Sequence, residues 1–199
     1  TGELAAKQDM LIGTLIELAA SENTGDEADG TIVDGLFMTL SNTNFDGSRI
    51  DAQTEKAKKL IGRDAEIRCK DIESLDADPD LRSLKELLLF GLKGLAAYYH
   101  HAEVLGGKDS SITAFMKKAL AALPEEKTAD ELVTLCMECG SAGAACMALL
   151  DRANTEAYGT PEITQVKTGT GKNPGILITG HDLKDLEQLL EQTQGTGID

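Results

Sequence analysis

Up to residue 154, apolar residues recur at the three- and four-residue spacing of amphipathic helices. Near the N-terminus, Leu4, Leu11, Ile12, Leu15 and Leu18 fall on one helical face. The same pattern, interrupted by stretches rich in Gly, Pro or acidic residues, predicts six helices: residues 4–20, 31–42, 48–69, 81–104, 112–123 and 128–154. The chain is therefore predicted to be mainly α.

An acidic stretch at residues 71–80 divides these helices into two groups of three. A Leu-Ala-Ala run at 18–20 matches another at 95–97, and at this offset the apolar positions before the two runs coincide. Two copies of a three-helix unit explain the match, although any two amphipathic helices align about as well. We expect a first three-helix bundle over residues 1–75 and a second over residues 76–160.

After residue 160 the pattern changes. Residues 163–166 and 176–178 are short apolar runs bounded by Gly or Pro, which predicts two strands. Asp182 is predicted to cap a following helix with an apolar stripe of Leu183, Leu186, Leu189 and Leu190. Because one strand–helix unit cannot form a stable parallel sheet, residues 161–199 are interpreted as the start of a truncated α/β (Rossmann-like) domain.

The net charge of the chain limits the classes of partner that it is expected to bind. The 199 residues include 34 acidic and 19 basic side chains, a net charge of −15, which disfavours nucleic acid and anionic membrane surfaces. No apolar run approaches the length needed to span a bilayer, and no secretory signal peptide is recognised. Four cysteines indicate reduced thiols rather than a disulfide scaffold. We therefore expect a cytoplasmic protein.

Two motifs resemble ligand sites but fail on spacing. Residues 169–172, Gly-Thr-Gly-Lys, lack the earlier Gly and the following Ser or Thr of a phosphate-binding loop, and an apolar strand follows them. Cys136, Cys139 and Cys146 lie on one predicted helix, where the outer two are roughly 15 Å apart along the axis. One metal ion cannot bind all three sulfur atoms, so we expect these cysteines to pack as small apolar residues in the protein interior. Cys136 and Cys139 could share a metal only with ligands from elsewhere.

Three polar clusters remain as candidates. His100 and His101 near a helix C-terminus are explained by the helix dipole. Helix capping and turn formation explain residues 41–44, Ser-Asn-Thr-Asn. His181 lies between Gly180 and the predicted cap, at the end of a predicted strand, where a metal-binding or proton-transfer role and a structural role are both open.

The block at residues 173–186, Asn-Pro-Gly-Ile-Leu-Ile-Thr-Gly-His-Asp-Leu-Lys-Asp-Leu, resembles the hybrid-cluster protein family, also called prismane protein or hydroxylamine reductase. Residues 191–199, Glu-Gln-Thr-Gln-Gly-Thr-Gly-Ile-Asp, continue the likeness. Further blocks fit the same family at 35–37, 42–46, 81–88, 91–94, 149–154 and 158–166. The resemblance covers essentially the whole chain.

This resemblance implies a helical first domain of two three-helix bundles, followed by α/β domains. It also implies two cofactors in the full-length protein, a cubane iron–sulfur cluster and a hybrid iron–sulfur–oxygen cluster. The family binds the hybrid cluster through one His, two Glu and several Cys, and the His of its Gly-His-Asp motif corresponds to His181. Ser41 and Asn42 match a Thr-Asn pair near that cluster, whereas Cys136, Cys139 and Cys146 match no ligand.

The implied activity is that of an oxidoreductase of nitrogen metabolism, which reduces hydroxylamine to ammonia or nitric oxide to nitrous oxide. Electrons would come from a redox protein through the cubane cluster. The family's N-terminal Cys motif and its later Glu and Cys ligands have no counterpart here, so we expect an internal fragment with no cluster and no activity alone. No catalytic residue is assigned. The alternative is a non-enzymatic helical packing or interaction module with a structural His181.

Overall fold

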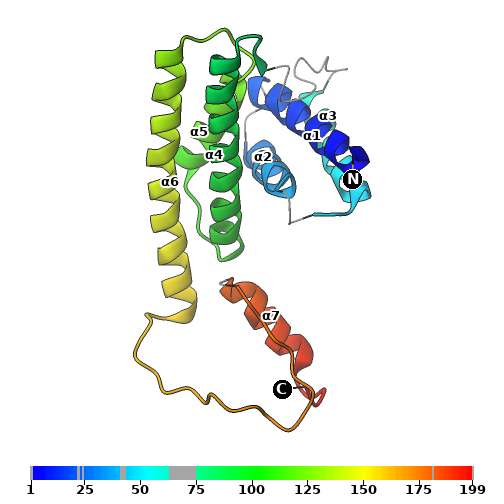
Figure 1. Ribbon diagram of the computed structural model, residues 1–199, viewed down its shortest axis with the longest axis vertical. Helices are drawn as coiled ribbons and strands as arrows, with labels where there is room; N and C mark the ends of the chain where they lie inside the picture. Colours follow the sequence, from blue (N-terminus) through cyan, green and yellow to red (C-terminus); the bar gives the residue numbers. More distant parts are fainter. Residues whose placement is uncertain are drawn as a thin grey trace.

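The computed structural model describes residues 2–21, 23, 25–40, 44–62, 75–180 and 182–198. Within these ranges there is no strand, and the helices are α1 (Gly2–Ala20), α2 (Asp26–Met38), α3 (Gly47–Ile61), α4 (Pro79–Val104), α5 (Ser110–Ala122), α6 (Ala129–Tyr158) and α7 (Leu183–Thr193) (Figure 1). The prediction of a mainly α protein is confirmed.

Capping groups explain where several helices begin and end. Asp78 accepts hydrogen bonds from the backbone of Asp80 and Leu81 and begins α4. Thr128 caps α6 as predicted, and the Glu131 side chain accepts a hydrogen bond from the backbone of Thr128. The third helix is shorter than predicted, because Gly62 adopts φ 71° and ends α3 at this point. The predicted end of that helix, near residue 69, lies outside the described residues.

Helix α2 differs most from the prediction. The polar composition of residues 21–30 predicts a loop, but α2 already begins at Asp26. Asp26, Glu27 and Asp29 lie in its first turn, where negative side chains interact favourably with the exposed N–H groups of the helix. The acidic composition that suggests a loop therefore suits a helix N-terminus equally well.

The six helices before residue 159 pack as two sets of three. In each set the first and third helices run parallel, α1 beside α3 and α4 beside α6, and the second helix returns antiparallel (Figure 1). Helix α2 also packs on α4, and α1 packs on α5. The buried residues of both sets belong to one hydrophobic cluster, so the two sets share a continuous core.

Small and sulfur-containing residues form the seam between α4 and α6. The Cys136 Sγ atom lies 3.8 Å from the Leu84 carbonyl oxygen, and Cys146 Sγ lies 3.8 Å from the Leu95 carbonyl oxygen. Between them, a Cβ atom added at Gly91 would come within 3.0 Å of the cysteine Sγ atom at position 139. Burial raises the pKa of the Cys146 thiol to about 11. These contacts confirm that the cysteines of this helix pack against α4.

Helix α6 is also unusually apolar. By length and composition alone it could cross a membrane, so the prediction that no apolar run approaches this length is wrong for α6. Its Gly, Ala and Cys residues allow the close approach to α4 described above, and Leu135, Cys146 and Leu149 belong to the shared core. The apolar character of α6 is thus used, at least in part, in helix–helix packing.

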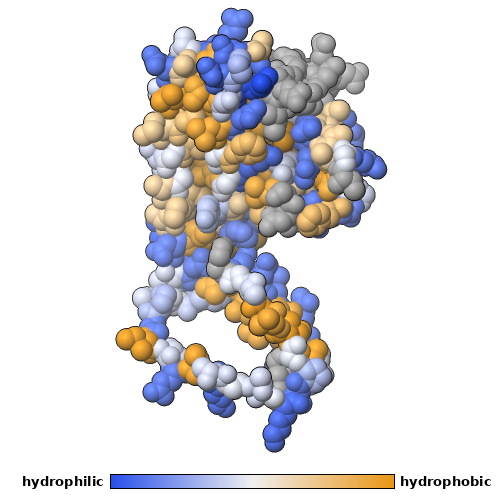
Figure 2. Space-filling model, in the orientation of Figure 1, coloured by the Kyte–Doolittle hydropathy of each residue, from blue (hydrophilic) through white to orange (hydrophobic). Residues whose placement is uncertain are grey.

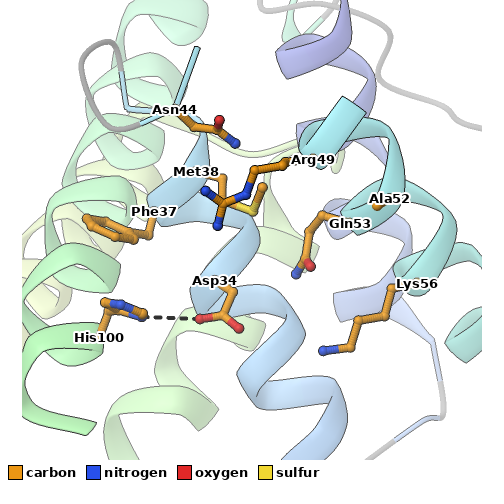
Figure 3. A pocket seen from close by; sticks show the side chains of 9 residues that line it. All are labelled: Asp34, Phe37, Met38, Asn44, Arg49, Ala52, Gln53, Lys56 and His100. Atoms are coloured by element: carbon orange, nitrogen blue, oxygen red, sulfur yellow. Dashed lines mark hydrogen bonds and ion pairs between the residues drawn. The ribbon is translucent and has the colours of Figure 1, made fainter. Parts of the chain in front are cut away.

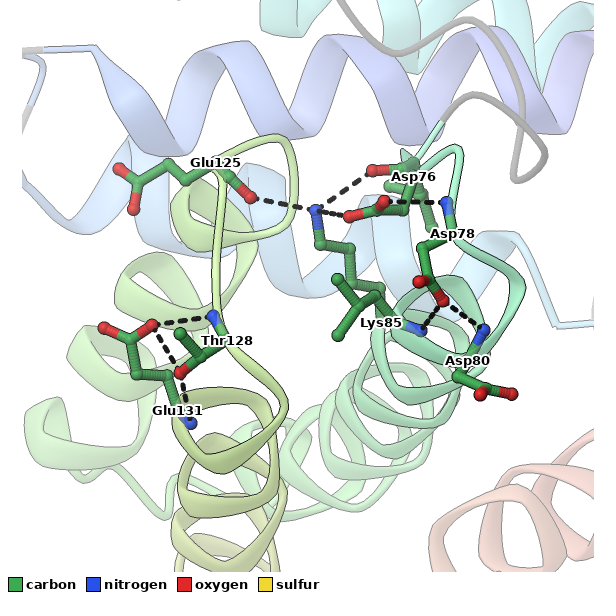
Figure 4. A network of polar contacts seen from close by, with 9 residues as sticks. Asp76, Asp78, Asp80, Lys85, Glu125, Thr128 and Glu131 are labelled. Carbon is green, nitrogen blue, oxygen red and sulfur yellow. Dashed lines mark hydrogen bonds and ion pairs between the residues drawn. The ribbon is translucent and has the colours of Figure 1, made fainter.

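A buried lysine connects three parts of the second set. The Lys85 side chain on α4 is 1% exposed, and its Nζ donates to the carbonyl oxygens of Leu75 at 3.0 Å and Glu125 at 2.8 Å. It also lies 3.0 Å from Asp76 Oδ2 (Figure 4). The hydrogen bond from Lys85 lowers the pKa of Asp76 below its usual value. One ammonium group therefore joins the segment before α4 to the turn between α5 and α6.

Gly35 provides a test of the packing between α1 and α2. A Cβ atom at this position would lie 2.7 Å from Leu15 Cδ1, and Leu15 is fully buried. We expect Gly35→Ala to lower the free energy of unfolding by about 1–3 kcal/mol, because the core is overpacked. Gly30 lies on the same helix, and a Cβ atom there would have no neighbour within 4 Å, so Gly30→Ala should instead stabilise by about 0.5–1 kcal/mol. Urea denaturation of the two variants measures both effects, and equal stabilities would contradict the clash.

The C-terminal segment differs from the expected strand–helix unit. Residues 159–180 are irregular and exposed, so the strands predicted at 163–166 and 176–178 are not formed here. An isolated strand has no neighbour to accept its backbone hydrogen bonds, which explains the irregular backbone. Helix α7 forms as predicted but has no buried residue, and its apolar side chains remain on the visible surface (Figure 2).

Candidate functional site

The three residues predicted to form or adjoin the cluster site, His181, Ser41 and Asn42, lie outside the described residues. Their described neighbours nevertheless locate the ends of both segments. Asp182 follows His181 directly, and Asn44 follows the segment that contains Ser41 and Asn42. The described residues that flank these positions therefore define the candidate site.

Asp182 serves two elements with its two carboxylate oxygens. Oδ1 accepts hydrogen bonds from the backbone N–H groups of Lys184 at 3.0 Å and Asp185 at 3.4 Å, so the prediction that Asp182 caps this helix is confirmed. Oδ2 lies 2.6 Å from Nδ1 of His101, on the last turn of α4. The start of α7 is thus joined to the end of α4.

The neighbouring His100 has a different carboxylate partner. Its Nδ1 atom lies 3.2 Å from Asp34 Oδ1 on α2. The Phe37 ring stacks on His100 with centroids 4.6 Å apart and meets His101 edge-on at 5.6 Å. We call Asp34, Phe37, His100, His101 and Asp182 the histidine junction. The helix dipole alone, the explanation offered from sequence, does not account for these partners.

The histidine junction brings together the ends of helices that are far apart in the sequence. Asp34 and Phe37 lie near the end of α2, which leads to residues 41–43, and Asp182 lies one residue after His181. Asn44 and His100 line one cavity of about 500 Å³ (Figure 3). Among the described residues, the buried Nδ2 of Asn44 has no hydrogen-bond partner. A buried free donor at this position is available to a bound group.

The cavity is rich in cationic groups, although the chain as a whole is acidic. Arg49 and Lys56 on α3 line it opposite Asp34 and His100 (Figure 3). The hydrogen bond that His100 donates to the Asp34 carboxylate raises the pKa of His100 above its ordinary value. Burial opposes this shift, and the nearby carboxylates of Glu103 and Asp182 add to it. The charged form of His100 is therefore more favoured than it is in a free imidazole.

The raised pKa of His100 predicts a pH-dependent stability. Because the folded-state pKa lies above the ordinary 6.5, the stabilisation by the pair is complete below pH 6.5 and is lost as the pH rises through the raised value. Asp34→Asn should remove about 0.5–1 kcal/mol of stability below this range and almost none well above it. Denaturation of both proteins across this range measures the difference. A difference that does not change with pH would contradict the assignment.

The described residues around the histidine junction contain no complete set of metal ligands. Among the described residues, no group of three His, Cys, Asp or Glu side chains could hold a metal ion. An imidazole is a suitable ligand for iron, and a free amide donor such as Asn44 Nδ2 suits the edge of an anionic cluster. The chemistry at the histidine junction therefore fits one wall of an iron–sulfur site, with the remaining ligands to come from elsewhere.

Sequence reasoning missed the residues that surround the predicted ligand. Asp182 was recognised as a helix cap, but its contact with His101 spans 81 positions and has no local signal. The pairing of Asp34 with His100 spans 66 positions. The one available clue was the pair of adjacent histidines, whose side chains must leave a helix in different directions and so meet different partners.

Comparison with known proteins gives a consistent result along the chain. The model of the Prismane/CO dehydrogenase family matches residues 1–199. A hydroxylamine reductase of Chlorobaculum tepidum is 52% identical over 188 residues, covering 82% of this chain and 35% of that protein. Those of Thermoanaerobacter pseudethanolicus and Methanosarcina mazei are 44% and 42% identical, and each match covers 100% of this chain and 43% of the relative. The chain thus spans less than half the length of these relatives.

Proposed function

Because the chain belongs to the Prismane/CO dehydrogenase family, we propose that it is the helical part of an oxidoreductase that reduces hydroxylamine to ammonia. The observation that carries this proposal is the similarity to hydroxylamine reductases over the whole chain, including the Gly-His-Asp block at 180–182. The histidine junction supports it, because it joins the helix that leads to residues 41–43 with the residue that follows His181.

The chemistry of hydroxylamine reduction determines what the site must supply. Reducing hydroxylamine takes two electrons and two protons, breaks the N–O bond and releases ammonia and water. A hybrid iron–sulfur–oxygen cluster would supply an open iron site for the nitrogen substrate, with electrons delivered by a redox protein through a cubane cluster. His181 would hold one iron through its imidazole. Ser41 and Asn42 would offer a hydroxyl and an amide at the edge of the site, next to the free Nδ2 of Asn44.

The finer features of this proposal concern the full-length protein. We propose that the same site also reduces nitric oxide to nitrous oxide, and that the protein is cytoplasmic. We further propose that residues 1–75 and 76–160 are two consecutive three-helix bundles and that residues 161–199 begin an α/β domain. The exposed apolar side chains of Ile163 and Leu177 support the last point, because further strands would cover them.

One imidazole cannot assemble a cluster of several irons, so the 199 residues alone are expected to bind no stable cluster and to show no activity. The proposal is tested on the full-length protein by iron analysis and by ammonia formation from hydroxylamine with a reduced electron donor. Bound iron and hydroxylamine-dependent oxidation of the donor are expected. A full-length protein without iron would leave the alternative, a helical interaction module in which His181 is structural.

A further inference from the structure

Helix α7 is joined to the rest of the molecule by few contacts. None of its residues is buried, and the irregular residues 159–180 that precede it are exposed. Two polar contacts attach it to the helices above: the Tyr158 hydroxyl donates to Glu187 Oε2 at 2.9 Å, and His101 Nδ1 lies 2.6 Å from Asp182 Oδ2. The second contact involves Asp182, which directly precedes α7 and directly follows His181 in the sequence.

The contact between His101 and Asp182 lies in a partly apolar environment. Tyr98, Leu105, Leu150 and Leu183 surround it, together with Asn154, around a small cavity of about 90 Å³. The side chains of His101 and Asp182 are 29% and 24% exposed. A charge-assisted hydrogen bond that is largely withdrawn from water is stronger and better oriented than one on an open surface.

Both partners are held in place by further contacts. The His101 ring meets Phe37 edge-on at 5.6 Å and His100 at 5.9 Å, so its orientation is fixed from α2 and from its own helix. Asp182 is fixed by the two backbone N–H groups of α7 that it caps. The backbone of Asp182 is therefore positioned relative to the ends of both α2 and α4.

We propose that His101 is a positioning residue for His181. It holds Asp182, the chain neighbour of residue 181, against the end of α4, and so restricts where the proposed ligand can lie. This inference rests on the proposed function, since it takes His181 to be an iron ligand. It assigns a role to His101, a residue outside the Gly-His-Asp block, through its contact with Asp182.

The experiment compares matched variants of the full-length protein. His101→Phe keeps an aromatic ring against Phe37 but removes the nitrogen that meets Asp182. His100→Phe makes the same change one residue earlier, where the lost partner is Asp34 instead. Asp182→Ser keeps a good helix cap but is too short to reach His101. His101→Gln restores a side-chain donor of similar length.

Two readouts report on positioning rather than on overall folding. Iron per protein is expected to fall about tenfold at limiting iron in His101→Phe and in Asp182→Ser, as for groups that orient a metal ligand, and to recover in part in His101→Gln. Amide hydrogen exchange of residues 183–187 is expected to accelerate about tenfold in His101→Phe. His100→Phe should lose less iron than His101→Phe and should leave the exchange of residues 183–187 close to the wild type, because its partner is Asp34 and not Asp182.

The outcomes separate this inference from the proposed function. If His181→Ala loses iron while His101→Phe keeps full iron and slow exchange at α7, the positioning role is wrong and the ligand assignment stands. If His181→Ala itself keeps full iron, the ligand assignment fails, and the inference fails with it. Equal losses in His100→Phe and His101→Phe would show general damage to the end of α4 and would also contradict the specific role of His101.

Discussion

Replacing Lys85 by Met is expected to lower the free energy of unfolding by about 3 kcal/mol, because it leaves a carboxylate and two carbonyl groups without their cation. Met has nearly the same length and volume, so no cavity contributes to the loss. Asp76 keeps some access to water, its side chain being 19% exposed, which limits the cost of leaving its charge unpaired. Urea denaturation monitored by circular dichroism measures the change.

Lys93 provides the matched control, since it is a second buried lysine on the same helix. It is 7% exposed, but among the described residues its Nζ has only weak contacts, 3.5 Å to the Thr39 carbonyl oxygen and 5.7 Å to the centroid of the Phe90 ring. Burial lowers the pKa of Lys93, so its charged form is already disfavoured in the folded protein. Lys93→Met should therefore remain within about 1 kcal/mol of the wild type. Equal losses for the two variants would show that burial alone, and not the three acceptors of Lys85, determines the cost.

In the full-length protein, His181→Ala is expected to remove most of the iron of the proposed hybrid cluster and to abolish hydroxylamine reduction. A missing ligand would leave one iron coordination position to water and so weaken the binding of the cluster. Iron analysis and ammonia formation from hydroxylamine measure the two losses.

The appropriate control is His100→Ala, which removes an imidazole from the histidine junction but not the proposed ligand. It should lose much less iron and activity than His181→Ala, together with the small, pH-dependent stabilisation that Asp34 provides. Full iron content and unchanged turnover in His181→Ala would overturn the ligand assignment. They would favour the interpretation of His181 as a structural residue.

The sequence predicted those parts of the fold that depend on local interactions. Thr128 and Asp182 were recognised as helix caps because capping involves residues two or three positions apart. The start of α2 was missed because Asp26 and its acidic neighbours suit a loop and a helix N-terminus alike. The strand expected at 176–178 was not formed, because a strand depends on a partner that periodicity cannot supply.

The candidate site was less predictable for the same physical reason. His181 was singled out by its position and by the resemblance to a family, and it remains a prediction. The contacts of the histidine junction join Asp34 to His100 and His101 to Asp182 across long stretches of chain. Lys85 likewise appeared in the pattern as an ordinary polar residue, although its acceptors lie up to 40 positions away.

The arrangement of α1 to α6 has a consequence for the order in which the molecule is made. Helices α1 to α6 pack on one another within and between the two sets, so their shared core is built from residues that precede α7. Synthesis proceeds from the N-terminus, and domains fold as they emerge. The end of α4, with His101 already oriented by Phe37, is therefore ready before residue 181 leaves the ribosome. The helical part would then act as a template on which the later segment, and any cofactor it binds, is assembled.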